Sequence, residues 1–211
     1  MSSHALRAEI IEVGRRLYEK GLIAATEGNI SVRLEDGQLV TAGGVSKGFL
    51  KPEQVVETDL DGRRLEGTCA VSSEVAMHAA IYRRRPDVNA IVHAHPPVAT
   101  AFAVAHMPLD QPILAEAVLV LGPVPLVRYA PPSTAELAEA VAEGLGGAGA
   151  ALLANHGAVT VGETLARAHL RMETLEHLAR VTLMARLLGR VSPLSADEVQ
   201  YLLRLPTAPY R

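Results

Sequence analysis

The chain has 211 residues, 49% of them hydrophobic and 20% charged, which is typical of a folded globular protein rather than a disordered one. Its net charge of -3 gives no sign of a surface for nucleic acid or membranes. The single cysteine, Cys69, excludes an intrachain disulfide and a zinc cluster built on thiolates. This length favours one domain over residues 1–211.

We expect a cytoplasmic protein that binds neither nucleic acid nor a membrane. The N-terminus lacks the charged and then apolar layout of a signal peptide. No apolar run reaches the roughly 18 residues that a membrane span requires.

The first third of the chain predicts a helix followed by short strands. The helix is capped by Ser3, carries apolar residues at helical spacing and ends before Gly21. Asp36-Gly37 is a turn signal that joins the first two strands into a hairpin. The expected strands cover residues 30–34, 38–41, 55–58 and 63–65.

A loop rich in glycine, T-A-G-G-V-S-K-G at 41–48, follows the hairpin. Exposed backbone N–H groups in such a loop can cradle a phosphate or another oxyanion, and Lys47 could add its charge. A plain connection with a solvated lysine is the commoner situation, so the loop alone does not decide between the two.

The next segment contains two candidate site motifs. Ser72 or Ser73 is expected to cap a helix that Pro86 stops, and two hydroxyls at a helix start suit a phosphate. The run N-A-I-V-H-A-H-P-P at 89–97 predicts a buried strand that ends in His93 and His95. Residues i and i+2 of a strand point to one side, so both imidazoles can face one point.

In the second half of the chain, helices and strands are predicted to be interspersed. A long loop at 106–117, broken by prolines, carries the titratable Asp110 and Glu116, and such loops are often functional. Capping boxes are expected at Ser133 and Ser195. The expected helices cover residues 98–105, about 133–144, 163–188 and a short stretch after 195, and the expected strands cover 124–127, 150–154 and 158–161. The tail at 205–211 either frays or reaches a neighbouring subunit.

These elements predict an α/β domain with a mostly antiparallel, mixed central sheet between helical layers. His156 ends the strand at 150–154, before Gly157, where we expect the backbone to need glycine's freedom. Three imidazoles and the carboxylate of Glu74 form a set that zinc accepts, as do manganese, cobalt and iron. A histidine pair on a strand is, by itself, equally consistent with ordinary surface hydrogen bonding.

The other histidines carry less weight. His78 lies one helical turn after Glu74 and could support the site. Four more are expected to be surface or helix-packing residues: His4, His106, His169 and His177.

Five motifs together resemble the class II aldolase and adducin-head family. They are G-N-I-S at 28–31, T-A-G-G at 41–44, S-S-E at 72–74, H-A-H-P at 93–96 and N-H-G at 155–157. The resemblance implies that fold and a homotetramer with active sites between subunits. It implies zinc held by His93, His95 and His156 with Glu74 as fourth ligand, and a phosphate held by Asn29, Gly44, Ser72 and Ser73.

The chemistry implied by the resemblance is aldol cleavage of a ketose 1-phosphate to dihydroxyacetone phosphate and a short aldehyde such as L-lactaldehyde. Breaking a carbon–carbon bond beside a ketone leaves an enediolate, whose oxygens need a Lewis acid. Glu74 can leave the metal and carry a proton. The phosphate anchors the remote end of the substrate.

Two departures from the family pattern keep other reactions open. Gly43 stands where members commonly carry serine or threonine. Glu116 lies in the region where the aldolase uses a tyrosine of a neighbouring subunit and where related dehydratases and epimerases use a carboxylate. A dehydratase, epimerase or decarboxylase with Glu116 as acid or base is therefore the alternative.

Three further hypotheses fit the sequence less well. A non-catalytic adducin-like module would not need the three histidines. A zinc hydrolase would not need the phosphate loop, and a Schiff-base aldolase using Lys47 would leave the metal set idle.

Overall fold

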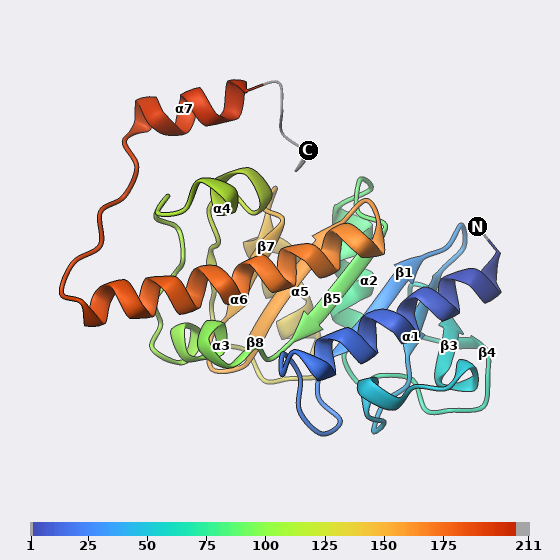
Figure 1. Cartoon of the computed structure of the whole chain (residues 1–211). Coiled ribbons are helices and arrows are strands. Elements are labelled where there is room, and N and C mark those ends of the chain that lie inside the picture. The colour runs from blue at the N-terminus through green and yellow to red at the C-terminus, as the bar shows by residue number, and fades with distance from the viewer. Residues whose placement is uncertain (1, 206–211) are drawn as a thin grey trace.

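The computed structural model describes residues 2–205, and in this range eight strands form one sheet with the order β4-β3-β2-β1-β5-β8-β7-β6 (Figure 1). Neighbouring strands run antiparallel, except for the parallel pair β6 and β7. The strands are β1 (Asn29–Arg33), β2 (Gln38–Thr41), β3 (Val55–Thr58), β4 (Arg64–Glu66), β5 (Ala90–Ala94), β6 (Leu126–Val127), β7 (Ala150–Leu153) and β8 (Gly157–Gly162). The predicted mostly antiparallel, mixed sheet is confirmed.

Helices cover both faces of this sheet (Figure 1). Those we describe are α1 (Ser3–Glu19), α2 (Val75–Arg84), α3 (Pro97–Val104), α4 (Ala115–Val120), α5 (Ala135–Leu145), α6 (Leu165–Leu187) and α7 (Ala196–Arg204), with the 3-10 helices η1 (Lys47–Phe49) and η2 (Pro52–Gln54). One hydrophobic cluster joins the sheet to α1, α3 and α6, and a second joins the other face to α2 and α5.

Strand β5 lies at the centre of the sheet and shows why its sequence is apolar throughout. Ala90, Val92 and Ala94 pack toward α1, α3 and α6, whereas Ile91 packs toward α2 and α5. Side chains alternate between the two faces of a strand, so both sets are buried. His93 falls on the side of Ile91 and is completely buried.

Two of the expected helix caps are wrong by one residue. Helix α1 is capped by Ser2, whose hydroxyl accepts from Ala5 N at 3.3 Å, not by Ser3. Helix α5 is capped by Thr134, because Ser133 has φ 66, whereas an N-cap residue normally has extended backbone. The capping box of Ser195 and Glu198 at α7 is confirmed.

The serine pair does not cap α2 as expected. The N-cap position is occupied by Glu74, which makes no side-chain cap hydrogen bond, and Ser72 Oγ accepts from Glu74 N at 3.3 Å. Ser73 and Ser72 therefore lie one and two residues before the N-cap position of α2.

The loop expected at 106–117 is shorter than predicted. Residues 115–120 form helix α4, so Glu116 lies in the first turn of a helix. Pro112 and the brevity of α4 concealed its helical pattern. Residues 206–211 of the expected tail lie outside the described residues. None of the helices in 2–205 combines the length and apolar character needed to span a bilayer.

Candidate active site

The three predicted metal ligands converge at one end of the central strands. His93 lies in β5, His95 directly follows that strand, and His156 lies between β7 and β8. Strands β5 and β8 pair antiparallel with Ala94 opposite Ala158, which brings residue 156 beside residue 95. One ligand atom from each histidine falls within 4.8 Å of the other two.

The fourth predicted ligand, Glu74, lies against this group. Its Oε2 is 3.1 Å from His93 Nε2, and its Oε1 is 3.3 Å from His156 Nε2. Asn29 Nδ2 donates to Glu74 Oε2 at 2.9 Å. The structure therefore brings together all four side chains that the sequence suggested for a metal.

The tautomer of His93 bears on what this group can bind. His93 Nδ1 donates to the carbonyl of Ala158 at 2.9 Å, so in the neutral ring Nε2 carries the lone pair. This lone pair is 3.2 Å from His95 Nε2 and 3.1 Å from the carboxylate of Glu74. Electron-rich atoms this close need a proton or a cation between them. Three imidazoles and a carboxylate suit a divalent metal such as zinc.

Burial favours the uncharged form of the imidazoles. It lowers the pKa of both His95 and His156 to about 4, with the neighbouring His93 acting in the same direction. Burial alone would raise the pKa of Glu74, but His93, His156 and the amide of Asn29 outweigh it and hold that pKa below its ordinary value. At neutral pH the set is two imidazoles that remain neutral beside an ionised carboxylate, which is the state that binds metal.

A cavity of about 330 Å³ adjoins this group and contains the predicted phosphate residues. Its lining residues are Thr26, Glu27, Gly28, Asn29, Gly43, Gly44, Lys47, Ser72, Ser73, Glu74, His95, Pro132, Ser133 and His156. Sequence reasoning missed Glu27, whose Oε2 is 3.2 Å from His95 Nδ1, and the segment at Pro132 and Ser133. The left-handed backbone of Ser133 leaves no recognisable sequence signal.

Two lining features bear on alternatives that the sequence left open. Lys47 is not solvated: it is 3% exposed and donates to the carbonyls of Thr26 at 2.7 Å and Val45 at 2.9 Å. Burial lowers the pKa of Lys47 to about 8. A Cβ on Gly43 would lie 3.0 Å from the carbonyl oxygen of Val71, so a side chain at this position requires the neighbouring backbone to shift by a few tenths of an ångström.

The glycine after His156 is needed for a different reason than expected. Asn155, not Gly157, adopts the left-handed conformation, with φ 54. A Cβ on Gly157 would lie 2.5 Å from His95 Cδ2 and 2.7 Å from the carbonyl oxygen of Ala94. The residue is small because the His95 ring packs directly on it. His106, expected to be a surface or helix-packing residue, is exposed, and its Nε2 lies 2.7 Å from Asn155 Oδ1.

His78, which the sequence suggested as a supporting residue, does not join the metal set, and its hydrogen bond is with Ser31. It is completely buried, and its Nδ1 lies 2.6 Å from Ser31 Oγ, which in turn lies 2.8 Å from the hydroxyl of Tyr82. Burial lowers the pKa of His78 to about 3, so this chain of side chains carries no charge at neutral pH.

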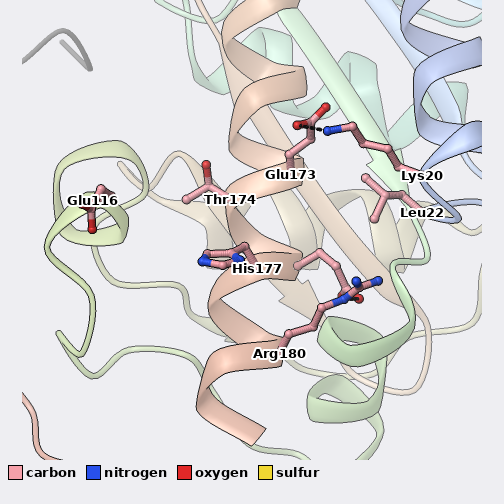
Figure 2. A pocket seen from close by; sticks show the side chains of 8 residues that line it. Lys20, Leu22, Glu116, Glu173, Thr174, His177 and Arg180 are labelled. Carbon is pink, nitrogen blue, oxygen red and sulfur yellow. Dashed lines mark hydrogen bonds and ion pairs between the residues drawn. The ribbon is translucent and has the colours of Figure 1, made fainter. Parts of the chain in front are cut away.

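Glu116 does not line the cavity beside the candidate metal ligands His93, His95 and His156. It lines a separate cavity of about 500 Å³ between α4 and α6. Figure 2 shows Glu116 on its own short helix, opposite Glu173, His177 and Arg180 of α6. Within one chain, Glu116 is therefore not brought together with Glu74 or the histidines, and its catalytic role stays a prediction.

Comparison with known proteins identifies the family. Residues 8–183 match the family described as Class II Aldolase and Adducin N-terminal domain. The chain belongs to this family. The predictions of its fold and of an enzyme of the class II aldolase type are confirmed by this match and by its relatives.

Relatives in the class II aldolase family differ in the reaction that their names give. A 5-deoxy-D-ribulose 1-phosphate aldolase of Bacillus thuringiensis serovar kurstaki is 34% identical, over 93% of this chain and 92% of the relative. A 3-oxo-tetronate 4-phosphate decarboxylase of Pectobacterium atrosepticum is also 34% identical, over 94% and 92%. The solved structure of an L-fuculose 1-phosphate aldolase has a TM-score of 0.90 at 32% identity, covering 96% of both chains.

Proposed function

We propose that this protein is a zinc-dependent class II aldolase. It cleaves a ketose 1-phosphate resembling L-fuculose 1-phosphate, reversibly, to dihydroxyacetone phosphate and a short aldehyde such as L-lactaldehyde. The observation that carries this proposal is the set of imidazole lone pairs and carboxylate oxygens facing one another beside a polar cavity. L-fuculose phosphate and 5-deoxy-D-ribulose 1-phosphate aldolases among the relatives support this substrate class.

The cavity offers the donors that a phosphate requires. Ser72 and Ser73 present hydroxyls, and the backbone at Gly44 presents an N–H without a side chain in the way. Asn29 gives one amide N–H to Glu74 and keeps a second for the phosphate. Phosphate binding at this end would hold the reacting carbons beside the histidines, which converts binding energy into orientation.

His93, His95 and His156 would hold zinc, with Glu74 as the ligand that substrate displaces. The bound zinc supplies positive charge that stabilises the negative charge developing on the substrate oxygens. In the cleavage direction the hydroxyl on the aldehyde side loses a proton, the carbon–carbon bond breaks, and the carbon beside the ketone gains a proton. We assign the delivery of that last proton to Glu74, which lies next to the metal ligands. Because Glu74 is ionised at neutral pH, it would first take a proton from water once substrate displaces it, and then pass that proton to the carbon.

Glu116 is the proposed partner for the hydroxyl proton. Because it lies in another cavity of the same chain, it can act only in the site of a neighbouring subunit. This requirement agrees with the proposed homotetramer in the cytoplasm with active sites between subunits. A decarboxylase, dehydratase or epimerase is the second candidate, favoured by the carboxylate at position 116 and by the decarboxylase among the relatives.

The test is release of dihydroxyacetone phosphate from L-fuculose 1-phosphate and from 5-deoxy-D-ribulose 1-phosphate. It is run on the purified protein, after chelation, and after zinc is restored. We expect release that chelation abolishes and zinc restores. Zinc binding without cleavage of either substrate, with carbon dioxide release from 3-oxo-tetronate 4-phosphate, would replace the aldolase with the decarboxylase. Absence of both zinc binding and turnover would favour a non-catalytic module.

A further inference from the structure

A buried carboxylate on α6 contacts the segment that follows the metal ligands. Glu176 is 3% exposed, and its Oε2 accepts from Ala99 N at 2.9 Å and from Val98 N at 3.1 Å. Its Oε1 accepts from Arg180 Nε at 2.8 Å. A carboxylate is tolerated at this depth only when donors replace water at its oxygens, and these contacts do so.

The contacts satisfy the start of helix α3, which begins two residues after His95. Pro96 and Pro97 have no N–H, and Pro96 at the N-cap position offers no capping side chain. Thr100 N already donates to the carbonyl of Pro96 at 2.8 Å. The first-turn N–H groups that need an outside acceptor are therefore those of Val98 and Ala99, and Glu176 accepts both.

This arrangement matters for His95 because that residue lies beyond the paired part of β5. The last pair of the β5–β8 ladder is Ala94 with Ala158. After it, His95 N donates to the carbonyl of Leu22 at 3.1 Å, and the next fixed points along the chain are the N–H groups held by Glu176. His93, in contrast, lies within the ladder and is completely buried.

We propose that Glu176 is a positioning residue that holds His95 in place for metal binding. By fixing the start of α3, it limits how far the His95-Pro96-Pro97 turn can move. It thereby keeps His95 Nε2 at 3.2 Å from His93 Nε2. The inference rests on the metal centre of the proposed function but not on the reaction, so it holds for an aldolase or a decarboxylase alike.

The test compares Glu176→Gln with Glu173→Gln. Both residues lie on α6, but Glu173 contacts Lys20 at 2.6 Å and His169 at 3.0 Å, and neither of these contacts involves α3. Zinc affinity is measured by competition with a chromophoric chelator, and the cobalt-loaded proteins are compared by visible absorption. We expect Glu176→Gln to weaken zinc binding about 10- to 100-fold and to alter the cobalt spectrum, as for other residues that orient ligands. Glu173→Gln should match the unmodified protein in both.

Unchanged zinc affinity and an unchanged cobalt spectrum in Glu176→Gln would overturn the proposal. The same holds if thermal stability falls while both metal measurements stay unchanged, because Glu176 would then serve the fold alone. If this variant does not fold, Arg180→Met replaces it. Arg180 has a half-exposed side chain, so its loss should spare the fold while leaving Glu176 Oε1 with only the longer contact from Val98 N at 3.3 Å, and the carboxylate less firmly oriented. We expect a severalfold weaker zinc affinity in Arg180→Met, and unchanged affinity would overturn the proposal.

Discussion

Adding one methyl group at Gly157 should disturb the metal centre directly. The new Cβ of Gly157→Ala would lie 2.5 Å from His95 Cδ2 and 2.7 Å from the carbonyl oxygen of Ala94, closer than real Cβ contacts come. Either the His95 ring turns away or the start of β8 separates from the end of β5. Overpacking of this kind costs roughly 1–3 kcal/mol of folding free energy. Because the displaced ring is a metal ligand, zinc affinity should also fall, by roughly 10- to 100-fold.

Two measurements and a matched control test this expectation. Urea unfolding of the metal-free protein gives the stability change, and chelator competition gives the zinc affinity. Gly147→Ala is the control, because a Cβ there meets no atom within 4 Å and its backbone is not left-handed. It should be neutral or stabilise by about 0.4–1 kcal/mol. If Gly157→Ala kept both the stability and the zinc affinity of the unmodified protein, the close packing of His95 on residue 157 would not be what requires glycine.

Three further predictions concern charge. Lys47→Met removes a buried cation that lines the cavity and should weaken the binding of inorganic phosphate, measured by calorimetry, at least about tenfold. Lys51→Met, at an exposed lysine, is the control and should leave phosphate affinity unchanged. Equal phosphate affinities of the two variants would show that Lys47 does not contribute to phosphate binding. Burial lowers the pKa of His95 and His156 to about 4 in the folded protein, against about 6.5 for an ordinary histidine. The unfolded chain therefore binds more protons between these two pH values. The metal-free protein should lose stability as pH falls from about 6.5 toward 4, which urea unfolding across that range would detect, and a flat profile would contradict the buried neutral imidazoles. Glu116→Gln should abolish a decarboxylase, dehydratase or epimerase activity. It should lower aldol cleavage but leave much of it, because water can still accept the hydroxyl proton in place of Glu116. An unaffected variant in both assays would exclude Glu116 from either role.

The sequence predicted elements best where turn signals bound short β-branched runs. The strands at 38–41 and 55–58 have the expected bounds, because glycine, proline and acidic turn residues lie on both sides. The caps at Ser2 and Thr134 were each misplaced by one residue, since two adjacent hydroxyl residues have equal capping chemistry. Only the backbone torsion, such as φ 66 at Ser133, separates them.

Local sequence patterns predicted the parts of the site, whereas its assembly was expected only from the family resemblance. The spacing of His93 and His95 on a strand follows from the pleat, and the sequence showed it. The approach of His156 depends on which residues of β5 and β8 face each other, and no local pattern specifies that register. Glu176 and Ala99, which are in contact, lie 77 residues apart in the sequence. The cavity lined by Glu116 likewise forms where α4 packs near α6. Such contacts arise from packing and leave no motif.

The supports of His93 and His95 are unequal, and this difference has a functional consequence. His93 sits in the ladder with Nδ1 fixed on the carbonyl of Ala158, so moving it means opening the sheet. His95 lies outside the ladder and depends on side-chain packing at Gly157 and on the cap that Glu176 provides. Substitutions at these supports should therefore lower metal affinity in graded steps and leave the sheet intact. Substitutions that displace His93 should instead lower stability and metal binding together.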